Sequence, residues 1–249
     1  MIDQTKPEKV SLAFISLMAV LMSFTAISID AMLPALGQIG EDLGIQNPNN
    51  TQHIISSLFV GLAIGVLFFG PFADSFGRKK AVYLGISIFL GGCMASIFTT
   101  NFETMLLGRA LQGFGAASCR IAAMCMIRDR FKGNAMARVM SFIMIIFILS
   151  PALAPSLGQI VLLFAHWRVI FVVMLLIGVI AVTWLAFGQK ETLKPENRRP
   201  FKIKPILHAA HETLTNKIAR GYMIDLGIIF GTFIGYLNSA QQILQVQYE

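Results

Sequence analysis

Six stretches of the chain contain no Asp, Glu, Lys or Arg, and each is long enough for a helix to cross a membrane. They cover residues 10–29, 43–73, 81–102, 139–167, 169–189 and 226–248. A hydrocarbon core of about 30 Å takes about 20 helical residues. Charged residues make up 13% of the chain, about half the share in soluble domains. The sequence therefore predicts an all-α polytopic membrane protein, and it excludes a soluble enzyme, a nucleic-acid-binding domain and a disulfide scaffold.

The polar segments between these stretches divide the chain into predicted parts. Residues 1–188 are predicted to form a six-helix transmembrane bundle, 189–221 a basic linker with an amphipathic helix, and 222–249 a seventh transmembrane helix of an incomplete second bundle. The first apolar run has 20 uncharged residues, which is longer than the apolar core of a signal peptide. We therefore expect a retained first helix, and spans at about 11–36, 51–73, 81–100, 104–127, 137–163, 168–188 and 222–245.

The basic residues predict the orientation of the chain. If the N-terminus is cytoplasmic, 17 of the 20 basic residues fall on the cytoplasmic side, among them Lys6, Lys9 and the run from Arg78 to Lys80. An excess of Lys and Arg in cytoplasmic loops sets the orientation of membrane proteins. The sequence thus predicts a multi-pass membrane protein with a cytoplasmic N-terminus, and the lipid bilayer as its first partner.

Asp30 is the first candidate functional residue because a carboxyl group inside a span is costly and usually functional. Pro34 follows one turn later, which predicts a locally loosened helix facing a cavity. Burial disfavours the charged form of a carboxyl group, and a group that binds and releases a proton is what proton-coupled transport requires. The alternative is an ordinary acidic residue that snorkels to the external surface.

A second cluster follows the second span, where Gly70, Asp74, Gly77, Arg78 and Lys79 stand in one short segment. Gly77 permits a tight turn, and Asp74 could cap a helix or pair with a cation. This spacing resembles the loop signature between the second and third helices of the major facilitator superfamily, G-x-x-x-D-x-x-G-R-K/R. The resemblance implies an interdomain latch with a salt-bridge or capping role for Asp74 and a gating role for Arg78.

The fourth span contains Arg109, which should face the bundle interior because an arginine in hydrocarbon needs polar partners. With Gln112, Gly113 and Gly115 it resembles the fourth-helix motif of the same superfamily, R-x-x-Q-G-x-G, which implies a part in proton coupling. Arg120 lies 11 residues later, on nearly the same helical face. We expect it either to attract an anionic group or to hold Asp30, or only to satisfy the fold.

The fifth span carries Pro151 and Pro155, two residues that cannot donate a backbone hydrogen bond and that bend a helix. Ala154 and Gly158 keep one face of this helix thin. The segment resembles the antiporter motif of the superfamily's drug exporters, although Gln159 stands where a second glycine is common. A generic helix kink is the other interpretation.

Within the superfamily, the chain resembles the bicyclomycin and chloramphenicol resistance branch. The segments that carry the likeness are 29–36, 127–129, 151–155 and 166–168 with Phe171. The resemblance implies efflux of small amphipathic drug-like compounds across the bacterial inner membrane in exchange for protons. We expect Asp30, Arg109, Gln112 and Arg120 to be the residues that bind substrate or protons. No cofactor, metal site, catalytic constellation or nucleic-acid partner is expected.

The length of the chain predicts that it is just over half of such a transporter, because the family uses about twelve helices arranged in two bundles. We therefore expect a missing six-helix C-terminal half as a partner. The alternative to an exporter is a non-transporting membrane fragment, or a half-transporter that needs a partner.

Overall fold

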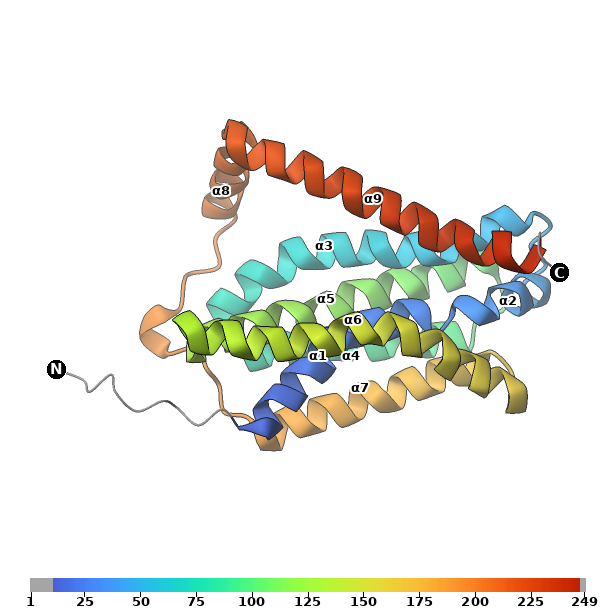
Figure 1. The fold of residues 1–249 in the computed structure, drawn as a ribbon, viewed down its shortest axis with the longest axis horizontal. Coiled ribbons are helices and arrows are strands. Elements are labelled where there is room, and N and C mark those ends of the chain that lie inside the picture. Colours follow the sequence, from blue (N-terminus) through green and yellow to red (C-terminus); the bar gives the residue numbers. More distant parts are fainter. Residues whose placement is uncertain (1–10, 247–249) are drawn as a thin grey trace. The chain divides into compact units, whose positions relative to one another are not determined.

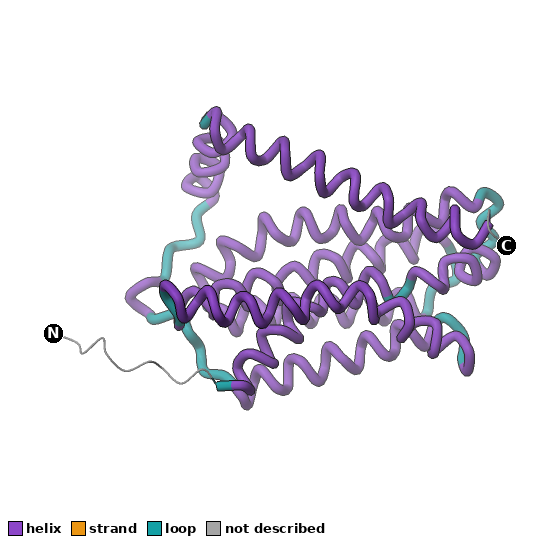
Figure 2. The backbone as a smooth tube through the Cα atoms, in the orientation of Figure 1, coloured by secondary structure: helices purple, strands orange, loops and turns teal. Residues whose placement is uncertain are grey.

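The computed structural model describes residues 11–246, and every regular element in that part of the chain is a helix (Figures 1 and 2). The chain divides after Arg198 into two compact units. The first unit contains α1 (Leu12–Asp30), η1 (Leu33–Ala35), α2 (Leu36–Asp42), η2 (Pro48–Thr51), α3 (Gln52–Phe76), α4 (Arg78–Ile97), α5 (Phe102–Arg130), α6 (Gly133–Phe164), α7 (Arg168–Gly188) and η3 (Pro195–Asn197). The second unit contains α8 (Ile203–Thr215) and α9 (Lys217–Val246). Lys6 and Lys9 lie outside the described residues.

Six spans of the first unit are long and apolar enough to cross a membrane, which confirms the predicted all-α polytopic class. They are 12–42, 49–76, 78–97, 102–130, 133–164 and 168–188. The described part of α9 is not among these candidate spans, so the seventh transmembrane helix stays a prediction. The spans are longer than predicted at several ends, because polar residues such as Asp74 and Arg128 are accommodated in the last helical turns.

The first span is not the continuous helix predicted over residues 11–36. α1 ends at Asp30, a 3₁₀ turn covers Leu33–Ala35, and α2 then continues to Asp42. The break follows from Pro34, which has no N–H to donate to the preceding turn and disfavours helical geometry in the residue before it. The helix is therefore loosened near Asp30, as predicted, by two turn residues and a 3₁₀ turn in a backbone that stays close to helical geometry.

The helices of the first unit run between two ends that can be defined by their side-chain contacts. At one end, Arg78 joins the α3–α4 turn to the ends of α5 and α7 through Asp129 and Glu191. At the other end, Asp42 accepts hydrogen bonds from His166 and Trp167 in the α6–α7 turn. We refer to these as the Arg78 end and the Asp42 end.

α5 forms the centre of this bundle because small residues let its neighbours approach its backbone. A Cβ atom at Gly113 would overlap the carbonyl of Leu58 in α3, and one at Gly61 of α3 would overlap the carbonyl of Ala110. Such close approach gives transmembrane helices their van der Waals contact where the hydrophobic effect between them is absent. The contact keeps α3 and α5 in fixed register along the part of α5 that carries Arg109 and Gln112.

In the second unit, the predicted amphipathic helix ends earlier than expected. Asn216 lies between the two helices, and its side-chain oxygen accepts hydrogen bonds from the backbone nitrogens of Ile218 and Ala219, at 3.0 and 3.2 Å. This is the geometry of an N-terminal cap, for which Asn is a preferred residue. α9 therefore begins at Lys217, and Arg220, which was predicted to lie in the linker, belongs to this helix.

Candidate functional site

Asp30 is the last residue of α1, and 4% of it is exposed. Within residues 11–246 it makes no hydrogen bond and no ion pair. Three more polar residues of α1, Ser23, Thr25 and Ser28, are also buried, and Thr25 donates a hydrogen bond to the carbonyl of Ala116 in α5, at 3.4 Å. α1 thus buries polar side chains on more than one of its faces and ends in a carboxyl group that the described residues leave without a partner.

Arg109 lies in the interior of the bundle, as predicted, and is fully buried. Its guanidinium donates one hydrogen bond to the side chain of Gln112, at 2.6 Å, and one to the backbone carbonyl of Ser28 in α1, at 3.0 Å. Gln112 in turn donates to the hydroxyl of Ser96 in α4, at 3.0 Å. Arg109 and Gln112, which the sequence places in one motif, are therefore in direct contact.

The contact between Arg109 and Ser28 holds α1 at its interruption. Carbonyl groups in the last turn of a helix have no partner within the helix, and cations stabilise that end of the helix dipole. Arg109 supplies both a donor and a positive charge two residues before Asp30. Its Nε atom is buried without a hydrogen-bond partner in the described structure.

α6 packs against this same break through the thin face predicted from its sequence. Ala154 and Gly158 are the buried residues of its second half. A Cβ atom at Gly158 would overlap the backbone carbonyl of Ala31, the residue directly after Asp30. Gly158 therefore lets α6 lie against the end of α1 beside the carboxyl group.

Pro151 and Pro155 do not break α6, which is one helix from Gly133 to Phe164. The helix changes direction in its second half (Figure 1), as two missing backbone donors would allow. Both prolines are half-buried, while Gln159 is exposed.

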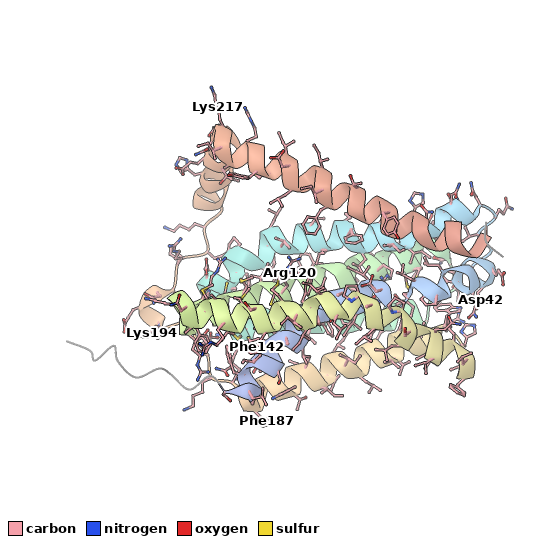
Figure 3. The ribbon with its side chains drawn as sticks, viewed as in Figure 1. Asp42, Arg120, Phe142, Phe187, Lys194 and Lys217 are labelled. Carbon is pink, nitrogen blue, oxygen red and sulfur yellow. The ribbon has the colours of Figure 1, made fainter. Side chains whose placement is uncertain are left out.

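Arg120 does not share the environment of Arg109, although the helical period places both on nearly the same face of α5. Arg120 is exposed, and its guanidinium lies 5.7 Å from the ring centre of Phe147 in α6 (Figure 3). In the described structure it forms no ion pair, so it does not hold Asp30, and that expectation is corrected. The reason is that the neighbours of one helical face change along its length, from α1 and α4 at Arg109 to α6 at Arg120.

The cluster at the Arg78 end is more extensive than the sequence predicted. Arg78 is nearly buried and donates hydrogen bonds to Asp74 at 2.7 Å, to Asp129 of α5 at 3.0 Å and to the backbone carbonyl of Ala73 at 2.8 Å. Asp74 lies inside α3 rather than in a loop, and the loop is reduced to Gly77 alone. Asp74 therefore forms a salt bridge and caps no helix.

Glu191, which the sequence analysis did not single out, supplies the missing cap. It follows α7, and its carboxylate accepts hydrogen bonds from the backbone nitrogens of Arg78 and Lys79, the first two residues of α4, at 3.0 and 3.1 Å. The same carboxylate also accepts from the backbone nitrogens of Thr192 and Leu193. No local signal predicts the cap, since Arg78 and Lys79 are more than 100 residues away from Glu191 in the sequence.

The two glycines and the lysine of the predicted signature have different surroundings. Gly77 has φ of +110°, and a Cβ atom there would lie 2.6 Å from the Glu191 carboxylate. Lys79 donates to the backbone carbonyls of Ala186 and Gln189 at the end of α7, at 3.0 and 2.7 Å. Gly70 has no atom of the described structure within 4 Å of an added Cβ, so its small size serves no contact in this bundle.

The helices described above are long and apolar enough to span a membrane, and they enclose a buried arginine and a buried carboxyl group. A charge network joins their ends on one side. These features define a polytopic membrane protein with an ionisable site. Comparison with known proteins makes this class specific. The family model of the Major Facilitator Superfamily matches residues 13–248. The chain therefore belongs to the Major Facilitator Superfamily, a family of membrane transporters.

Several bacterial members of the family are similar to this chain. A bicyclomycin resistance protein homolog of Haemophilus influenzae is 32% identical over 237 residues, which are 93% of this chain and 58% of that protein. The uncharacterized MFS-type transporter YdgK of Bacillus subtilis is 31% identical, over 98% of this chain and 60% of its own length. The multidrug resistance protein MdtL of Klebsiella pneumoniae is 30% identical, over 84% of this chain and 53% of its own length.

The similarity to these proteins confirms the predicted likeness to the drug-efflux branch of the superfamily. The chain spans somewhat more than half the length of the relatives it matches. Among solved structures, the human organic anion transporter MFSD10 (TETRAN) has the same fold, with a TM-score of 0.54 at 19% identity over 76% of this chain and 48% of that one. These comparisons confirm the predicted N-terminal bundle of a major facilitator fold.

Proposed function

We propose that this chain is the N-terminal part of a proton-driven exporter of small amphipathic drug-like compounds, and that Asp30 is its proton and substrate site. The observation that carries the proposal is the burial of Asp30 without a partner at the interruption of α1. An ionisable residue within a span is costly and usually serves transport. The resistance functions printed for the relatives support the substrate class.

In the proposed mechanism, the carboxyl group of Asp30 alternates between a proton and a substrate while two bundles rock about a central site. Arg109 keeps the broken end of α1 in place through the carbonyl of Ser28. Transport requires a second bundle, so the activity is proposed for the protein in which this chain is joined to, or assembled with, one. A chain without such a partner would be the non-transporting alternative.

We infer that the Arg78 end faces the cytoplasm of a bacterial cell and serves as the gate. Arg78, Lys79, Arg130 and Lys190 lie at this end, whereas Arg168 lies at the Asp42 end. This asymmetry agrees with the excess of Lys and Arg expected on the cytoplasmic side. Arg78 would latch one state of the transporter through Asp74 and Asp129.

The test is efflux of a fluorescent dye from cells that lack their own multidrug exporters and express the protein containing this chain. We expect efflux to stop when an uncoupler removes the proton gradient, and Asp30→Asn to abolish it at unchanged protein level. Glu103→Gln, which changes an exposed carboxylate at the start of α5, should leave efflux unchanged. Efflux that survives both the uncoupler and Asp30→Asn would rule out proton antiport.

A further inference from the structure

A polar pocket lies at the Arg78 end, between the last turn of α5 and the segment that follows α7. Its volume is about 670 Å³, within the range of about 300–1,000 Å³ typical of small-molecule sites. Neither Asp30 nor Arg109 lines it, so it is separate from the proposed proton site, and it shares Asp129 and Glu191 with the cluster at the Arg78 end. The lining residues that carry charge are Asp129, Arg130, Lys190, Glu191 and Lys194.

The two carboxylates of this pocket are already engaged. Asp129 binds Arg78 and accepts a hydrogen bond from the hydroxyl of Thr192, at 2.9 Å. Glu191 accepts from four backbone N–H groups. Lys190 and Lys194, in contrast, are exposed and make no hydrogen bond or ion pair within residues 11–246. With three cations and two carboxylates in its lining, the pocket keeps an excess of positive charge, and Lys190 and Lys194 can still bind an anion.

An apolar groove begins where this pocket ends. It has a volume of about 550 Å³ and is lined by Val179, Ile180, Thr183, Trp184, Phe187 and Gly188. These residues form one stripe of α7, on a different face from the buried Gly178, Ala181 and Leu185 that pack against the bundle. Gly188 lines both the groove and the pocket.

The position of the two hollows fits the boundary between hydrocarbon and headgroups. Phe187 is 90% exposed and lies with Lys194 at the same end of the bundle, opposite Asp42 (Figure 3). Trp184, one turn before Gly188, is the kind of side chain enriched at membrane interfaces. An apolar groove in the membrane thus leads into a cationic pocket at its surface.

We propose that the pocket and the groove together bind one anionic phospholipid, with its phosphate at Lys190 and Lys194 and an acyl chain along α7. Basic pockets at the ends of transmembrane helices bind anionic headgroups, and the excess positive charge of the pocket favours such a lipid over a zwitterionic one. The apolar groove favours a lipid over a soluble phosphate compound. The proposal concerns the outer face of α7 and does not depend on transport.

Tryptophan fluorescence of the purified 249-residue chain can test this, because Trp184 lines the groove while Trp167 is fully buried at the Asp42 end. The chain is placed in micelles that contain brominated phosphatidylglycerol or brominated phosphatidylcholine, and Trp184→Phe gives the signal of Trp167 alone. We expect brominated phosphatidylglycerol to quench Trp184 at a lower mole fraction than brominated phosphatidylcholine does. Lys190→Gln with Lys194→Gln should reduce this preference about fivefold for each lysine.

The matched control is Lys80→Gln with Lys132→Gln, which removes the same charge from exposed lysines that do not line the pocket. This control should keep the preference. Equal quenching by both lipids, or an equal loss in both double variants, would overturn the proposal. Thr183→Phe fills the groove and should lower quenching by either lipid if the acyl chain lies there.

Two other occupants are distinguished by further measurements. Relief of quenching by soluble glycerol phosphate at the concentration of the lipid would indicate a site for free phosphate compounds and would contradict a lipid site. Native mass spectrometry should show one retained phosphatidylglycerol per chain. A dimer without lipid would instead show that a second copy covers the groove.

Discussion

The side chain of Glu191 closes the first turn of α4, with its Oε1 atom 3.0 Å from the backbone nitrogen of Arg78. A carboxylate at the N-terminus of a helix satisfies N–H groups that have no partner in the helix and complements the helix dipole. Because Glu191 follows α7, this bond also fixes the end of the bundle's last helix to the α3–α4 turn.

Replacing Glu191 should therefore destabilise the bundle. We expect Glu191→Ala to cost about 1–2 kcal/mol, the usual value of a lost helix cap, and Glu191→Gln to cost less because one acceptor oxygen remains. The midpoint of thermal unfolding in detergent measures the effect. Glu196→Gln, an exposed residue of η3, serves as the control and should leave the midpoint unchanged. An equal shift in both would mean that net charge, not capping, matters.

Gly158→Ala should separate α6 from the break in α1. The added methyl group would overlap the backbone carbonyl of Ala31, which cannot move aside as a flexible side chain can. Overpacking of this kind typically costs about 1–3 kcal/mol. Denaturation with sodium dodecyl sulfate measures the loss.

The matched control for this change is Gly91→Ala in α4, where no atom lies within 4 Å of the new methyl group. It should be neutral or stabilising by up to about 1 kcal/mol, because alanine is the better helix former. If Gly158→Ala were as well tolerated as Gly91→Ala, the close packing of α6 on α1 would be wrong.

Gln112→Leu should weaken the buried network around Arg109. The leucine would leave one guanidinium nitrogen of Arg109 and the hydroxyl of Ser96 without their partners. Unsatisfied buried groups cost about 1–3 kcal/mol each and more when charged, so we expect a loss of about 2–4 kcal/mol in the free energy of unfolding. Gln159→Leu in α6 replaces an exposed glutamine and should cause no loss.

Hydrogen exchange of α1 provides a second measurement of the same variant. If Arg109 holds the end of α1, the amides near Ser28 should exchange faster in Gln112→Leu than in the parent chain, and Gln159→Leu should not change them. Unchanged exchange near Ser28 would show that the network does not support the break.

Arg78→Lys should open the network at the Arg78 end although the charge is retained. A lysine is a point charge without the planar fork of arginine, so it cannot serve Asp74, Asp129 and the carbonyl of Ala73 together. We expect a loss of about 2–4 kcal/mol in stability. Limited proteolysis in the α5–α6 turn should be faster.

Arg128→Lys is the control. Arg128 lies in the last turn of α5, is exposed, and makes no hydrogen bond or ion pair in the described part of the chain. Its proteolysis rate should match that of the parent. Equal rates for Arg78→Lys and the parent chain would contradict the structural role of the Arg78 contacts.

The amino-acid pattern was sufficient for the spans and for the interior position of Arg109, since both follow from the cost of placing charge in hydrocarbon. It also located the interruption near Asp30, because Pro34 acts on its own chain neighbours. The pattern did not predict the surroundings of Arg120. It placed Arg120 on the same helical face as Arg109, but the residues that this face meets depend on how α5 packs against α1 and α6. A helical wheel carries no information about those neighbours.

Long-range partners were beyond the sequence for a related reason. The sequence analysis did not pair Asp129 with Arg78, and the two residues meet because the start of α4 lies against the end of α5. Glu191 has no neighbour in sequence that predicts its contact with α4. Such contacts depend on which helix ends lie together, and a chain with several apolar spans of similar length does not specify that arrangement by pattern alone.

The single-residue connection at Gly77 has a mechanical consequence for α3 and α4. With one residue between them, and that residue at φ of +110°, the two spans have almost no slack with which to slide or tilt independently. A displacement of α3 is passed to α4 through one backbone joint, which Glu191 and Arg78 brace on either side. A tilt of α3 against α4 would therefore have to change the backbone angles of Gly77 and break the contacts that Glu191 and Arg78 make beside it.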